Sequence, residues 1–178
     1  AGAGFASLSG DHSAVKLNLN SAAGDLWRTE GNFTATATTV NTPNNGNSAA
    51  FFTTSTNDFI GYCWRSIEGF SKFGLFEGNS NADGPFVYLG FRPRLVFLKA
   101  LDATENWQIR DTARHKNTGS QTRIYWNSNA AEGTASTASP IDFLANGFKI
   151  RGSNSEINSN TIIYGAWGDV PSKFNNAF

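Results

Sequence analysis

The sequence predicts an all-β fold, an antiparallel β-sandwich of the jelly-roll or lectin-like type with little helix. Apolar and polar residues alternate with period two over 14–20, as in a strand with one buried face. No long stretch keeps apolar residues at helical spacing without a glycine, proline or asparagine cluster interrupting it. Short strand-like segments separated by turn residues are typical of sandwiches.

The expected strands follow one another along the whole chain. They are 14–20, 31–40 (the weaker pattern), 59–67, 86–91, 94–101, 107–111, 122–126, 148–151 and 161–167. Asn146-Gly147 lies between two apolar segments and predicts a hairpin with a type I′ turn, because both residues tolerate positive φ. Residues 44–47 predict a second turn, and 78–85 a longer loop that leads into the strand after Pro85.

The length of 178 residues fits one domain, so we expect a single sandwich over 1–178. Composition changes near residue 57, after which most of the aromatic residues occur. Residues 1–57 are interpreted as outer strands of the same sandwich or as a distinct oligomerising segment, with 58–178 as the core. The first reading is favoured because strand alternation has no use in a linker. Methionine is absent, so we expect the chain to derive from a longer product.

Charge and cysteine content exclude several classes of protein. Fourteen basic and fourteen acidic residues give zero net charge, so the basic surplus of a nucleic-acid-binding protein is missing. No window is long and apolar enough to cross a bilayer, and no membrane insertion is expected. The single Cys63 excludes an internal disulfide.

The residues that catalysis requires are scarce. His12 and His115 are the only histidines, and no enzymatic activity, metal or cofactor is expected. Asn79, Asn81 and Asp83 have calcium-loop spacing, but Gly90 occupies the position of the bidentate acid, which favours a plain polar loop. A polysaccharide depolymerase would need two acids in one cleft and stays open as an alternative. Its candidate acids beside aromatic residues are Glu68, Glu77, Asp102, Glu105 and Asp111.

Two tryptophans are candidates for sugar contact. Trp107 follows Asn106 and Trp126 precedes Asn127, and aromatic faces beside amide groups suit a carbohydrate, although the default for such rings is to pack between sheets. Asn79, Asn81, Asp83 and His115 complete the weak binding candidates, because they lie in expected loops, 78–84 and 114–121.

An ordered series of blocks begins at residue 59. It includes Tyr62-Cys63-Trp64 and Gly90-Phe91-Arg92-Pro93, and continues through 68–74, 78–79, 83–88, 106–107, 111–114, 141–144, 146–151 and 161–164. From Phe59 onward the chain resembles a β-rich domain of unknown function found in tail-fibre-like structural proteins of marine tailed bacteriophages, of the cyanophage and pelagiphage type. Residues before about 57 do not match the pattern of this resemblance.

The resemblance implies a virion protein of the tail or particle surface, assembled in the host cytoplasm, without known catalytic residues. We therefore expect a tail-fibre or surface-appendage domain that attaches to the host by non-covalent binding. The expected partners are other virion proteins, sister copies, with a homotrimer favoured, and a host surface glycan. The alternatives are a capsid decoration or tail assembly protein that binds only virion proteins, and the depolymerase.

Overall fold

The fold is described from a computed structural model. It describes residues 62, 64–114, 122–134 and 140–168, together with four two-residue strands nearer the N-terminus. The chain forms two compact units, one made of Ala1–Val15 and Ala23–Arg65, the other of Lys16–Ala22 and Ser66–Phe178. In the first unit β1 (Ser13–Ala14) pairs antiparallel with β2 (Gly24–Asp25), and β3 (Thr34–Ala35) with β4 (Val40–Asn41).

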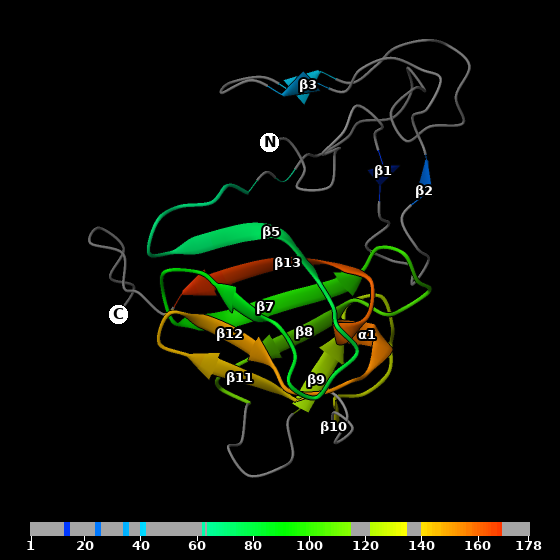
Figure 1. Cartoon of the computed structure of the whole chain (residues 1–178). Helices are drawn as coiled ribbons and strands as arrows, with labels where there is room; N and C mark the ends of the chain where they lie inside the picture. Colours follow the sequence, from blue (N-terminus) through cyan, green and yellow to red (C-terminus); the bar gives the residue numbers. More distant parts are fainter. Residues whose placement is uncertain are drawn as a thin grey trace. The chain divides into compact units, whose positions relative to one another are not determined.

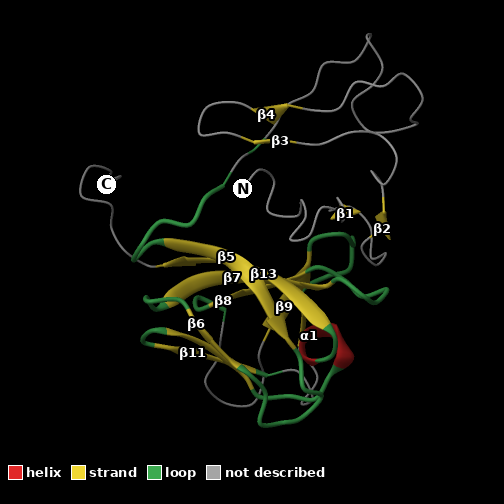
Figure 2. Ribbon diagram, turned by 45° about the horizontal axis from the view of Figure 1, so that its top comes forward, coloured by secondary structure: helices red, strands yellow, loops and turns green. Residues whose placement is uncertain are grey.

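The second unit contains two antiparallel sheets (Figures 1 and 2). The large sheet has the order β10-β9-β8-β7-β13-β5 and the small sheet the order β11-β12-β6. Their strands are β5 (Ser71–Glu77), β6 (Phe86–Tyr88), β7 (Pro93–Ala100), β8 (Gln108–Asp111), β9 (Thr122–Tyr125), β10 (Gly133–Thr134), β11 (Ile141–Leu144), β12 (Gly147–Ile150) and β13 (Thr161–Gly168). The helix α1 (Ser155–Asn158) lies at one end of the sandwich.

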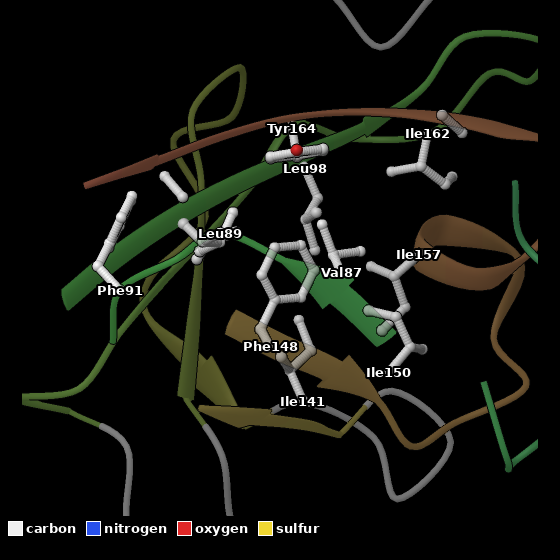
Figure 3. Close-up of a cluster of buried hydrophobic side chains, with 13 residues drawn as sticks. Val87, Leu89, Phe91, Leu98, Ile141, Phe148, Ile150, Ile157, Ile162 and Tyr164 are labelled. Carbon is white, nitrogen blue, oxygen red and sulfur yellow. The ribbon is translucent and has the colours of Figure 1, made fainter. Parts of the chain in front are cut away.

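The hydrophobic core fills the space between the two sheets (Figure 3). Strand alternation turns every second residue of β7 and β13 inward, where they meet the inner residues of the small sheet and α1. The most deeply buried members are Val96, Leu98, Ala100, Ile141, Phe148, Ile150, Ile157, Ile162 and Ala166. Burial of each large side chain contributes roughly 1.5–3 kcal/mol. The predicted all-β sandwich with little helix is confirmed.

Most expected strands after residue 85 are confirmed, with shifted ends. The prediction of a strand at 59–67 is wrong for the described residues 62 and 64–67, where Ile67 makes only an isolated bridge with Ser71. The chain reverses there, with Gly69 at a φ of +73° and two hydrogen bonds between Ile67 and Ser71. This turn leads into β5, which the sequence analysis missed.

The two strands expected nearer the N-terminus are 14–20 and 31–40. The segment 31–40 is not one strand, because β3 within it pairs antiparallel with β4, Thr34 opposite Asn41 and Ala35 opposite Val40. Only Ala14 of the segment 14–20 lies in a described strand, and the turn at 44–47 falls outside the described residues.

The hairpin of β11 and β12 is confirmed, but its predicted turn type is wrong. Leu144 pairs with Gly147, which leaves Ala145 and Asn146 as the turn. Within the described ranges neither of these residues has positive φ, which a type I′ turn requires of both. Gly147 has another role: a Cβ atom there would lie 2.1 Å from the Val87 carbonyl oxygen, so only glycine lets β12 approach β6.

Candidate functional site

The predicted binding loop after β5 is built by its own amide side chains. The backbone N–H of Asn81 donates to Asn79 Oδ1 at 3.0 Å, and that of Asp83 donates to Asn81 Oδ1 at 2.9 Å. Asn158 of α1 also holds the loop. Its Oδ1 accepts from Asn79 N at 3.0 Å, and its Nδ2 donates to the Asn81 carbonyl at 2.6 Å. The side-chain oxygens of Asn79 and Asn81 therefore hold the loop.

Asp83 joins this loop to the outer face of the small sheet. Its carboxylate lies 2.8 Å from Lys149 Nζ and 3.9 Å from an Arg151 guanidinium nitrogen. Arg151 Nε also donates to Asp142 Oδ2 at 2.7 Å. We call these four residues, Asp142, Arg151, Asp83 and Lys149, the ion-pair row. The hydrogen bond from Lys149 and its charge hold the pKa of Asp83 below its usual value.

Two aromatic side chains of β6 lie on this same outer face. Phe86 is 43% exposed and Tyr88 59%, while Val87 between them is buried in the core. The residue pattern over 86–91 predicts a strand here, but its aromatic residues were expected in the core. The signal that could have found them is the alternation around Val87, which turns both rings away from the core.

The structure separates the two predicted tryptophans. Trp107 is fully buried, so the prediction of a surface sugar contact at Trp107 is wrong; its ring packs against Phe97, 5.7 Å between centroids. Trp126 is 42% exposed and borders the same cluster, 5.8 Å from Phe97. We call this group the outer aromatic cluster, because strand alternation places it on the large-sheet face opposite the core; its members are Phe73, Phe97, Trp107, Trp126 and Trp167.

The amides beside these tryptophans do meet, although they are 21 residues apart in the chain. Asn127 Nδ2 donates to Asn106 Oδ1 at 2.9 Å, and Trp107 N donates to Asn127 Oδ1 at 2.9 Å. These bonds tie the start of β8 to the end of β9. His115, the remaining predicted site residue, lies outside the described residues.

A buried polar network anchors α1 to the inner face of β8 and β9. Glu156 Oε2 accepts from Arg123 and from Gln108, each at 2.6 Å, and Glu156 Oε1 accepts from the Tyr125 hydroxyl at 3.0 Å. Burial, with the nearby charge of Arg123, lowers the pKa of Arg110 to about 10. Burial and Glu156 raise the pKa of Tyr125. The network is suited to holding the helix, because Glu156 pairs with Arg123 and accepts from Gln108 and Tyr125, which come from both strands.

The acids proposed for hydrolysis mostly have local structural partners. Asp102 accepts from the backbone of Thr161 at 3.0 Å, and Glu105 accepts from the Ser155 hydroxyl at 2.8 Å. Asp111 is bound by the backbone and guanidinium of Arg114. Within the ranges that the structure describes, no group of three or more His, Cys, Asp or Glu residues could hold a metal ion.

Asp111 gives a prediction for acid stability. Burial acts to raise its pKa, but hydrogen bonds from Arg114 and Ala113 and the Arg114 charge outweigh it, so the pKa lies below the ordinary 3.8. A depressed folded pKa stabilises the fold above the unfolded pKa, and this contribution is lost as pH falls through the folded value. We expect Asp111→Asn to flatten the loss of stability below about pH 4. Urea unfolding of both proteins across that range measures it, and equal slopes would contradict the prediction.

One protein-family model matches nearly the whole chain. The family model described as "Domain of unknown function (DUF7483)" matches residues 5–171. The chain belongs to this family. The DUF7483 match starts well before residue 57 and so includes the segment that lay outside the blocks described above. No curated protein and no solved structure matches the sequence. No helix in the described part of this DUF7483 domain is long and apolar enough to span a membrane.

Proposed function

We propose that this DUF7483 domain is a non-enzymatic attachment domain of a phage tail fibre or related surface appendage, and that it binds a host surface glycan without covalent chemistry. The observation that carries the proposal is the outer face of the small sheet, where exposed aromatic rings stand beside a loop fixed by its own amides. Aromatic faces bordered by polar groups suit a saccharide, which has apolar C–H faces and many hydroxyls. The resemblance to tail-fibre-like proteins supports the virion location.

Pre-organisation of the loop supports a binding role. Asn158 is completely buried and donates to two backbone carbonyls, those of Asn81 and Gly152. A loop held in this way loses little conformational freedom when a ligand binds, so more of the contact energy is realised as affinity.

A second candidate, assembly with other virion proteins or sister copies, is favoured by Trp126. This large ring is exposed at the margin of the outer aromatic cluster, and tryptophan is enriched at protein interfaces. Under this reading the chain self-associates, with a trimer expected, and Trp126→Ala shifts the oligomer towards monomer. Light scattering coupled to size-exclusion chromatography measures both states.

The test of the proposed function uses purified chain and surface polysaccharide isolated from host bacteria. We expect saturable binding without release of oligosaccharide. Absence of binding, together with a stable oligomer, would replace attachment by assembly. Oligosaccharide release that one acid-to-amide substitution abolishes would overturn the non-enzymatic proposal in favour of a depolymerase.

A further inference from the structure

We infer that the outer face of the small sheet is a stacking site for an uncharged saccharide, with Phe86 and Tyr88 as the rings on which it lies. The inference rests on the proposed function and deepens it, because it names the residues and the class of glycan. We call these two side chains the ring pair.

The strand β6 places the ring pair on one face. Its burial alternates, with Phe86 and Tyr88 exposed and Val87 facing the core. Residues two apart on a strand lie about 7 Å from each other along it. A linear saccharide that follows β6 therefore meets both rings in succession.

Each ring leans over a glycine. A Cβ atom on Gly147 would lie 3.1 Å from two carbons of the Phe86 ring, and one on Gly90 would lie 3.7 Å from the Tyr88 hydroxyl. The far end of each ring therefore lies against backbone, which limits its motion, while 43% of Phe86 and 59% of Tyr88 stays exposed to solvent. An exposed ring of restricted motion is suited to stacking on a sugar.

Lys72 of β5 holds one of the two rings. Its ammonium donates to the Tyr88 carbonyl at 2.8 Å and lies 5.3 Å from the centroid of the Tyr88 ring. A cation at this distance is attracted to the ring face. Because the same lysine binds backbone and ring, Tyr88 is oriented before any ligand arrives.

The charges of the ion-pair row favour an uncharged ligand. Asp142 and Asp83 alternate with Arg151 and Lys149, so the two negative and two positive charges of the row compensate one another. The further cation at the rings, Lys72, is engaged by the Tyr88 carbonyl and ring. A polyanion would have to compete with Asp83 and Asp142 for these cations. Sugar hydroxyls both donate and accept hydrogen bonds, so they can contact the row without breaking it.

The experiment measures polysaccharide binding by calorimetry, with dextran, mannan and starch as neutral probes and alginate and heparin as acidic ones. We expect binding of a neutral probe that changes less than about twofold between low and high salt, because no net charge is neutralised. Tyr88→Ala should weaken it about tenfold, while the matched Tyr88→Phe, which keeps the ring, should stay within about twofold. Tyr88→Leu, which keeps apolar volume without a ring face, should behave as Tyr88→Ala.

Thermal unfolding of each variant shows whether a loss of binding is caused by a loss of folding. If Tyr88→Ala and Tyr88→Leu bind the neutral probe as the parent protein does, the rings do not contact the saccharide and the inference is wrong. The glycan binding itself would still support the proposed function. Salt-sensitive binding of an acidic probe alone, or loss of binding only in Trp126→Ala, would likewise overturn the inference and leave the proposed function standing. Failure of the unchanged protein to bind any probe or host polysaccharide would refute both.

Discussion

Replacing Glu156 by alanine is expected to lower the free energy of unfolding by about 3–5 kcal/mol, because it breaks a buried ion pair and leaves the cation behind. The side chains of Glu156 and Arg123 are 14% and 18% exposed, and their charged atoms lie 2.6 Å apart. The substitution also deprives Gln108 and Tyr125 of their acceptor. Urea denaturation followed by tryptophan fluorescence measures the loss.

Two comparisons test this explanation. Glu132→Ala removes an exposed acid 3.5 Å from Arg114 and should cost less than about 1 kcal/mol. Replacing Glu156 and Arg123 together by leucine should cost less than the sum of the two single changes, since no charge stays buried without its partner. A fully additive double variant would show that the pair is not the source of the effect.

Replacing Gly147 by alanine should destabilise the small sheet by about 3 kcal/mol or more, through overpacking against backbone. The added Cβ would lie 2.1 Å from the Val87 carbonyl oxygen, which belongs to the neighbouring strand and cannot rotate away as a side chain would. The two strands would have to separate, and the ring pair would move with β6. Thermal unfolding measures the loss of stability.

Gly133 provides a matched control for Gly147. A Cβ atom on Gly133 would meet its nearest neighbour, the Ala131 carbonyl oxygen, only at 4.0 Å. Gly133→Ala is therefore expected to stay within about 0.5 kcal/mol of the parent protein. Equal destabilisation by the two substitutions would show that loss of glycine, rather than contact with Val87, is responsible.

The sequence was sufficient to predict the strand class and most strands after residue 85, because alternation and turn residues act locally. It did not identify β5, Ser71–Glu77, whose burial is intermediate along nearly its whole length and whose pattern is correspondingly weak. The Asn146-Gly147 pair predicted the hairpin correctly, but the type I′ turn that it predicted there is wrong. The requirement for Gly147 comes from β6, which lies about sixty residues earlier in the chain.

The candidate site was only partly predictable. Asp83 was chosen for its loop, yet its partners are supplied by distant sequence, Lys149 in the second strand of the hairpin and Arg151 directly after it. Trp107 and Trp126 have similar polar neighbours, and only the packing around Phe97 buries one and leaves the other exposed. Which face of a strand is covered depends on the other sheet, and single-sequence alternation does not contain that information.

The pairing of β5 with β13 has a mechanical consequence. Ser71 at the start of β5 lies opposite Trp167 near the end of β13, so the chain enters and leaves this ladder at the same end. Tension on those two points would load the hydrogen bonds one after another, as in unzipping, instead of all at once in shear. The strands of the small sheet lie outside this path, so a pull would begin to open β5 from β13 before it distorted the face that carries Phe86 and Tyr88.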